Sequence, residues 1–453
     1  MTILSYVLAF LFAIGVLVAV HEYGHFWMAR RCGIRVLRFS IGFGKRLWTR
    51  TDRQGTEYAI SAIPLGGYVK LLDEREGPVP SQDLSFAYNR KPVWQRILVL
   101  LAGPFANFLF AAMAYWILFM AGIPALKPVL GDVTPDSFAA RAGLTAGDQI
   151  VSVAGRATGT REAVVLALLD RLMEGGTIEL TVRSAEGSTR VAPLRIEGST
   201  LPLTEPGALL PGLGFEFWYP AVPAEVGNIL QGSPAERAGL KTGDRIVAVD
   251  GEPVADFPSL VKLVQPQPGK TLEFTIERAG GRSVLPVEVK AERDGDKLVG
   301  RIGVQPASPG TIPEDMKTRE RYGPFGSVAR AVDKTWEMSA LTVRLLWNVG
   351  TGDVSVKNLS GPINIAEYAG FSARQGILAF LSFLAIVSVS LFVLNLLPIP
   401  ILDGGQIVYQ LAELVKGSPL SEQAQAVGQK VGIFLLLVLM SFAFYNDLSR
   451  LFS

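Results

Sequence analysis

The sequence predicts a polytopic α-helical membrane protein with four transmembrane helices and two copies of a small α+β domain between the second and third helices. Hydrophobic residues make up 49% of the 453 residues, and they are concentrated in long uncharged runs. A hydrocarbon core ~30 Å thick requires about 20 helical residues, and three of the runs meet this length. The four runs cover residues 3–20, 97–122, 377–402 and 431–444.

The fourth run is short, so we expect its helix to extend from Gly428 to Leu448. The charges it would then include, Lys430 and Asp447, lie near its ends and can reach the interface. The predicted transmembrane helices therefore cover residues 1–30, 96–122, 377–405 and 428–450.

Positive charge indicates the orientation of these helices. Eight Lys and Arg residues lie between Arg30 and Arg53, and no Lys or Arg precedes the first run, which argues against a cleaved signal peptide. The positive-inside rule then places residues 31–95 and the connection 406–427 in the cytoplasm. The N-terminus and residues 123–376 are expected outside it.

Charge and cysteine content exclude several functional classes. The net charge of +2 gives no indication of nucleic acid as a partner, and the basic residues after the first helix are explained by topology and by the lipid bilayer. Cys32 is the only cysteine, so neither an internal disulfide nor a cysteine-based metal site is expected.

Residues 123–310 contain an internal repeat. The pattern Ala-Gly-Leu-x-x-Gly-Asp-x-Ile occurs twice, and Gly239 follows Gly143 by 96 residues, as Gly243 follows Gly147. Each copy reads as a strand, a short helix ending at glycine, a Gly-Asp turn and an alternating apolar strand. Two copies of one domain are therefore predicted.

Each copy resembles the bacterial PDZ domain, the first over 123–220 and the second over 221–310. PDZ domains bind an extended peptide as an added strand, with a glycine-bracketed loop that can hold a terminal carboxylate. The first copy's candidate loop is Gly212, Leu213, Gly214 and Phe215, and residues 301–304 are a weaker candidate in the second. Spacer domains with unused grooves are the alternative.

Residues 311–376 are expected to form an amphipathic helical region. Apolar residues recur at largely helical spacing between Pro324 and Asn348, with charged residues between them. This pattern fits a helix at the membrane interface, and equally a helix packed on the preceding domain.

His21 and His25 are the only histidines, and they end the first apolar run. At i, i+4 spacing on a helix, both rings lie on one face and can share one zinc ion. Glu22 is placed to act as general base on a water activated by the metal. Histidines capping the helix at the interface are the structural alternative, which an ionisable cluster at the end of a membrane helix disfavours.

Catalytic zinc normally has three protein ligands, so a carboxylate is needed. Asp403 is the only acidic residue adjoining the third run, where Pro398 and Pro400 interrupt the helix. The first and third helices run in the same direction, which places Asp403 at the depth of the histidines. Asn395, on the same broken helix, could hydrogen-bond a substrate carbonyl or its oxyanion, or serve only as a structural cap.

These motifs resemble the site-2 protease family of intramembrane zinc metalloproteases (M50 type), and within it the bacterial regulators of sigma-E. The resemblance covers essentially the whole chain: the His-Glu-x-x-His motif, tandem PDZ domains, and the Asn-x-x-Pro-x-Pro-x-Leu-Asp-Gly motif that begins at Asn395. It implies Zn²⁺ held by His21, His25 and Asp403, with Glu22 as general base and Asn395 assisting. It also assigns residues 102–107 to a motif of small residues at a helix contact. Close packing of helices through Gly103 is a sufficient explanation of this motif.

The resemblance further implies a cytoplasmic, membrane-associated β-hairpin over residues 58–71. Gly66, Gly67 and Tyr68 there would hold an unwound substrate as an added strand. The implied substrates are single-pass membrane proteins of a Gram-negative inner membrane, such as an anti-sigma factor trimmed beforehand, and remnant signal peptides. A non-catalytic PDZ membrane scaffold and a metal transporter or sensor are the rival functions.

Overall fold

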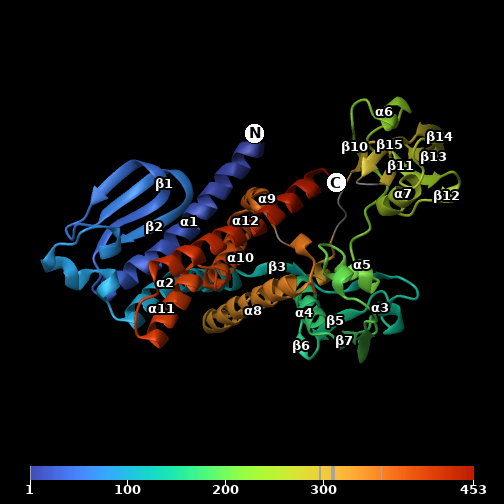
Figure 1. Cartoon of the computed structure of the whole chain (residues 1–453). Coiled ribbons are helices and arrows are strands. Elements are labelled where there is room, and N and C mark those ends of the chain that lie inside the picture. The colour runs from blue at the N-terminus through green and yellow to red at the C-terminus, as the bar shows by residue number, and fades with distance from the viewer. Residues whose placement is uncertain (1, 295–296, 308–311, 359, 453) are drawn as a thin grey trace.

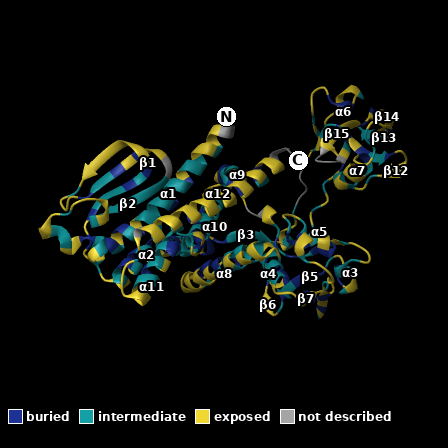
Figure 2. Ribbon diagram, viewed as in Figure 1, coloured by how far each residue is buried: buried dark blue, intermediate teal, exposed yellow. Residues whose placement is uncertain are grey.

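Four helices are long and apolar enough to cross a membrane in the part of the chain that the computed structural model describes, which omits residues 1, 295–296, 308–311, 359 and 453. The chain is therefore a polytopic membrane protein, and the second of these helices packs against the first and the third (Figure 1). Their outward faces carry exposed apolar side chains along much of their length, as expected where lipid is the solvent (Figure 2). The four are α1 (Thr2–Arg31), α2 (Val93–Ala121), α10 (Ile377–Leu396) and α12 (Glu422–Phe452).

A bent sheet follows α1. Its strands β1 (Val36–Thr51) and β2 (Glu57–Leu71) pair over their whole length. Ser40 is paired with both Ala59 and Tyr68, so the first half of β1 lies between two parts of β2. The last part of β2 is consequently an edge beside α1. Apolar residues of α1, α2 and the sheet share one buried cluster, which fixes the sheet against the helices. Short 3₁₀ turns at Glu74–Glu76, Ser81–Phe86 and Tyr88–Arg90 lead into α2.

The two repeats have the same topology. Each has a four-stranded sheet, a two-stranded pair formed by its first and last strands, and helices around its own apolar core; the first repeat adds a third, short helix and the second a further two-stranded pair. The first sheet has the order β6-β5-β7-β8 and the second β12-β11-β13-β14. The first repeat comprises β4 (Leu130–Val133), α3 (Phe138–Arg141), β5 (Gln149–Val153), β6 (Arg156–Ala157), α4 (Arg161–Glu174), β7 (Thr177–Arg183), β8 (Thr189–Arg195), η4 (Leu201–Thr204), α5 (Leu209–Leu213) and β9 (Phe215–Phe217).

The second repeat comprises β10 (Val226–Ile229), α6 (Pro234–Arg237), β11 (Arg245–Val249), β12 (Glu252–Pro253), α7 (Phe257–Val264), β13 (Thr271–Arg278), β14 (Gly281–Glu288), β15 (Lys290–Asp294), β16 (Lys297–Arg301) and β17 (Val304–Pro306). The repeated Gly-Asp turn has a structural role in both copies. Asp148 accepts a hydrogen bond from the backbone of Thr145, and Asp244 does the same from Lys241, at 2.9 and 2.7 Å.

The helical region after the repeats joins them to the membrane bundle. Strand β18 (Lys317–Glu320) pairs with β3 (Ile123–Leu126) directly after α2, and α8 (Pro324–Thr351) then packs on α2 and α10. Ion pairs from Arg344 to Asp170 and from Lys334 to Glu162 connect α8 to helix α4 of the first repeat. The aromatic residues Phe325, Trp336 and Trp347 of α8 are exposed.

Helices α9 (Pro362–Gln375) and α11 (Asp403–Lys416) pack beside the membrane helices. Helix α9 packs on α1, and the buried Asp447 of α12 accepts hydrogen bonds from backbone N–H groups at its start. Helix α10 ends at Leu396, and α11 begins after a six-residue break and packs on α2.

Candidate active site

His21, His25 and Asp403 meet where α1 and the start of α11 approach each other. The Nε2 atoms of the two histidines are 3.1 Å apart. Asp403 Oδ2 lies 3.2 Å from Nε2 of His21 and 3.4 Å from Nε2 of His25. Among the described residues these three form the group of His, Cys, Asp and Glu side chains able to share one metal ion.

The spacing of these atoms fits zinc. Ligands 2.0–2.2 Å from a tetrahedral zinc ion lie about 3.3–3.6 Å from one another, close to the three separations observed. Asp403 Oδ2 is also buried and accepts no hydrogen bond in the structure. A buried carboxylate oxygen without a donor is costly unless a cation takes its place, so the donor set is suited to a divalent ion.

Hydrogen bonds from α2 orient the His25 ring. Its Nδ1 lies 2.7 Å from the carbonyl oxygen of Val99. A carbonyl can only accept, so Nδ1 carries the proton and Nε2 presents its lone pair toward Asp403 and His21. Gly103, one turn further along α2, leaves room for this ring, because a Cβ at that position would overlap it.

Asn107 of α2 is the corresponding partner of His21. Its amide lies 3.3 Å from His21 Nδ1, and its buried Oδ1 has no hydrogen-bond partner. The oxygen and nitrogen of an amide have the same shape, so turning Oδ1 toward the ring lets it accept a hydrogen bond from His21 Nδ1. His21 Nδ1 then donates and Nε2 is free to bind metal. The Ser388 hydroxyl of α10 donates a hydrogen bond to the backbone carbonyl of Asn107 at 2.8 Å and fixes this part of α2.

The break between α10 and α11 sets the position of Asp403. Gln406 donates a hydrogen bond to the carbonyl of Pro400 at 2.7 Å, which closes the turn. Gly404 and Gly405 pack against backbone carbonyls of the break so closely that a Cβ at either position would overlap them. Asp403 is therefore held by a tight turn and not by continuation of the transmembrane helix.

The three candidate ligands line a cavity of about 440 Å³. Glu22 lines the same cavity, and its side chain packs against Gly67, where an added Cβ would lie 2.9 Å from Glu22 Cγ. Asn395 lines it too, with its amide donating to the Leu391 carbonyl at 3.0 Å. Tyr88 borders the cavity, and burial raises the pKa of its hydroxyl to about 12, so it remains protonated.

The edge of β2 covers one side of this cavity. Gly67 and Tyr68 line it, and Tyr68 is stacked on Phe43 of β1 with ring centroids 6.1 Å apart. Gly66 lies against the Phe43 ring with a positive φ of 118°, a conformation that favours glycine. The three residues therefore place an edge strand next to Glu22.

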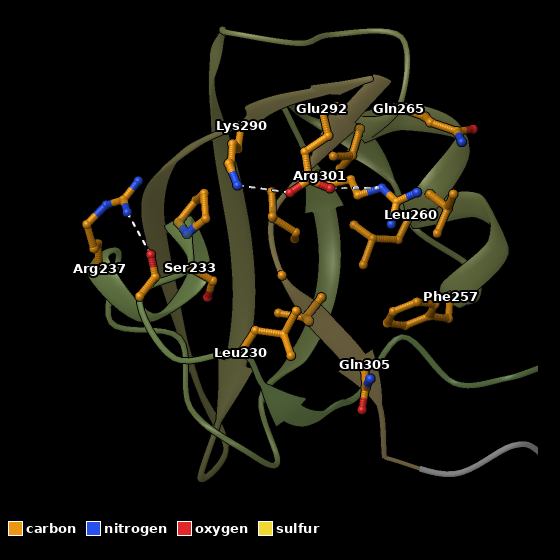
Figure 3. A pocket seen from close by; sticks show the side chains of 18 of the residues that line it. Leu230, Ser233, Arg237, Phe257, Leu260, Gln265, Lys290, Glu292, Arg301 and Gln305 are labelled. Carbon is orange, nitrogen blue, oxygen red and sulfur yellow. Dashed lines mark hydrogen bonds and ion pairs between the residues drawn. The ribbon is translucent and has the colours of Figure 1, made fainter. Parts of the chain in front are cut away.

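The two candidate loops of the repeats differ in their surroundings. In the first repeat Gly212 and Leu213 end α5, Gly214 caps it with a positive φ, and Phe215 begins β9. Leu213 and Phe215 are buried in the core. In the second repeat, residues 301–304 line a groove of about 740 Å³ beside α7 (Figure 3). The groove has an apolar floor that includes Leu230 and Leu260.

Sequence reasoning missed the contributions of α2 to this site. The carbonyl of Val99 and the amide of Asn107 orient the two histidines, and the space above Gly103 holds one of them. The motif at residues 102–107 indicated only close helix packing. The spacing of Val99, Gly103 and Asn107, one helical turn apart, was the available signal.

Comparison with known proteins identifies the family. The model of peptidase family M50 matches residues 9–439 of the chain. The chain belongs to peptidase family M50. Curated relatives agree over the full length: a regulator of sigma E protease of Salmonella typhi is 44% identical over 460 residues, 100% of both chains. Regulator of sigma-E protease RseP of Escherichia coli K12 is 43% identical over 445 residues, 98% of both.

A third relative, named a putative zinc metalloprotease, from Vibrio cholerae, is 40% identical over 449 residues and 98% of both chains. Together with the four membrane helices, the family match makes this M50 peptidase a membrane-embedded metalloprotease with Zn²⁺ as its cofactor.

Proposed function

We propose that His21, His25 and Asp403 hold the catalytic zinc and that Glu22 is the general base. When bound, the zinc supplies the Lewis acidity that makes water nucleophilic near neutral pH. Glu22 takes the proton from the attacking water and passes it to the leaving amine. Asn395, in the same cavity, donates a hydrogen bond to the carbonyl that is attacked. The observation that carries this proposal is the convergence of the three donor atoms.

The substrate binds as an extended strand along Gly66, Gly67 and Tyr68. A transmembrane helix uses its backbone groups internally and must be unwound before its peptide bonds can be attacked. The edge of β2 lies beside Glu22 and offers unpaired backbone groups to a strand. Strand addition there supports an extended substrate above the three ligands.

The biological role is regulated intramembrane proteolysis in the sigma-E stress response. Two of the relatives are named regulators of sigma-E. We assign as substrates single-pass membrane proteins already trimmed by another protease, such as an anti-sigma factor, and remnant signal peptides. The enzyme resides in the inner membrane with residues 31–95 in the cytoplasm and the N-terminus and repeats in the periplasm, in agreement with the basic residues after α1.

The two repeats are PDZ domains that admit shortened substrates. The shared strand order of their four-stranded sheets and the groove beside α7 support this assignment. The repeats can select trimmed substrates in two ways. They can exclude an intact substrate because of its size, or the second repeat can bind the new carboxyl terminus of a trimmed substrate. The loop Gly212–Phe215 of the first repeat has the same place in its domain, but two of its side chains belong to the core.

A cleavage assay with matched variants tests this function. The purified full chain is assayed for bound zinc and for cleavage of a model transmembrane substrate, beside Glu22→Gln and Asp403→Asn. We expect Glu22→Gln to retain zinc and lose cleavage, whereas Asp403→Asn loses both. Cleavage unchanged in Glu22→Gln would overturn the mechanism. If the unmodified chain binds zinc but cleaves nothing, a metal sensor or transporter would be favoured. If it neither binds zinc nor cleaves the substrate, a scaffold would be favoured.

A further inference from the structure

An apolar groove of about 880 Å³ lies between α1 and α2. Its lining is apolar except for the polar tips of Tyr23 and Trp27. The groove exists because small residues bring the helices together: a Cβ on Gly24 would overlap the backbone at Ala102. Larger side chains then form the walls, among them Val16, Val20, Phe105, Leu109 and Met113.

The groove is separate from the catalytic cavity. At about 100° per residue, Val20, Gly24 and Trp27 are centred roughly 110° around α1 from His21 and His25, on a neighbouring face of the helix. The two cavities share no lining residue. The groove opens within the membrane-spanning parts of α1 and α2, and Phe105 and Leu109 are about half exposed there, at 54% and 53%. Its surroundings are therefore lipid hydrocarbon.

A cationic cavity of about 580 Å³ adjoins this groove where α1 ends. Both cavities are lined by Tyr23 and Trp27, and the second adds Arg30, Arg31 and Arg35 with no acidic residue in its lining. Arg30 is paired with Asp52 and Arg35 with Asp83, outside the lining.

Arg31 is the uncompensated charge of this cavity. No ion pair of Arg31 occurs among the described residues, and its guanidinium lies over the Trp27 ring, 5.1 Å from the centroid. One net positive charge is thus left at the membrane interface, at the end of an apolar groove.

We propose that this continuous surface binds one anionic glycerophospholipid, with an acyl chain in the groove and the phosphate at Arg31. Charge and position favour this occupant: a cation lies at headgroup level and an apolar groove lies at acyl-chain depth. A substrate helix is too large to be enclosed there, since a helix ~10 Å wide and ~30 Å long occupies roughly 2,400 Å³. The bound lipid would fill the seam between α1 and α2, the helices that position both histidines.

Quenching of Trp27 fluorescence by brominated lipid tests the proposal. The full chain is reconstituted in two kinds of phosphatidylcholine vesicle. One contains a fixed fraction of phosphatidylglycerol with brominated acyl chains, and the other contains the same fraction of phosphatidylcholine with brominated acyl chains. Subtracting the signal of Trp27→Phe isolates this residue from the other six tryptophans. We expect brominated phosphatidylglycerol to quench Trp27 more strongly, and Arg31→Gln to reduce this preference about fivefold.

Matched variants separate the site from general charge effects. Arg31→Lys should keep the preference, and so should Arg53→Gln, which removes an exposed charge from the sheet turn. Equal quenching by the two lipids in the unmodified chain, or an unchanged preference in Arg31→Gln, would overturn the proposal. Loss of the preference on adding inorganic phosphate would also overturn it and would indicate an ion site. Loss of the preference on adding a transmembrane substrate peptide would overturn it too and would indicate a substrate-docking groove.

Discussion

The Arg96 guanidinium and the Glu413 carboxylate form a two-point ion pair, with N–O distances of 2.5 and 3.0 Å. The pair joins α2 to α11, and the side chains are only 7% and 17% exposed. Helix α2 supplies the hydrogen-bond partners of both histidines, and α11 begins at Asp403. The ion pair thus connects the two elements on which the metal ligands depend.

Replacing one partner of this ion pair should therefore destabilise the protein strongly. Arg96→Met leaves the Glu413 charge buried without a partner, which typically costs ~3–5 kcal/mol. We expect a lower thermal midpoint and reduced zinc retention. The double variant Arg96→Met with Glu413→Met should recover much of the loss, measured by thermal unfolding in detergent. Additive losses in the double variant would contradict this account.

Gly103→Ala should weaken zinc binding, because the added Cβ overlaps the His25 ring and displaces a candidate ligand. A disturbance of this kind lowers metal affinity by about 10–100-fold, which competition with a chelator can measure. Gly15→Ala is the matched control in a membrane helix, since nothing lies within 4 Å of a Cβ there. Equal affinity in the two variants would rule out the steric explanation.

Asn107→Leu should also reduce zinc affinity, by removing the hydrogen bond that orients His21. Asn107→Asp should restore much of the affinity, because a carboxylate accepts the proton of Nδ1. Ser390→Ala, which loses a hydrogen bond only to its own helix, serves as the control. If Asn107→Asp is as impaired as Asn107→Leu, the amide has a packing role instead.

Acid should loosen the β1–β2 sheet through Glu57. Hydrogen bonds from Arg46 at 2.7 Å, and also from Arg38 at 2.9 Å, hold the pKa of this carboxyl below its ordinary 4.5. Because the folded pKa is depressed, the stabilisation is complete above 4.5 and is lost as pH falls from there through the folded value. Hydrogen exchange along β2 should quicken over that range, and Glu57→Gln should remove the pH dependence. A pH dependence equal in both proteins would exclude this carboxyl as its source.

The sequence predicted the parts of the candidate site that lie in two short motifs, one near each end of the chain. His21 and His25 are fixed by helical spacing, and the interruption of the third apolar run by Pro398 and Pro400 indicated where Asp403 should lie. In the structure their donor atoms lie within 3.4 Å of one another. The four membrane helices are confirmed, with the fourth extended beyond its apolar run as expected.

The contacts made by α2 could not be predicted in this way. Almost every position of α2 is apolar or small, so the one-turn spacing of Val99, Gly103 and Asn107 does not stand out from the other faces of the helix. The roles of Gly103 and Asn107 depend on which face of α2 meets α1. The pairing of β1 with two parts of β2 was likewise hidden, because the basic residues between Arg35 and Arg53 indicated topology and masked the strand pattern.

The three candidate ligands come from opposite ends of the chain, because His21 and His25 lie in α1 and Asp403 begins α11. A ribosome delivers His21 and His25 with the first helix, and Asp403 only after both repeats and α8 have emerged. With the proposed ligand set, a nascent chain has no complete metal site until its synthesis is nearly finished. Until Asp403 is in place, the chain lacks one of the three proposed ligands and cannot cleave neighbouring membrane proteins through this site.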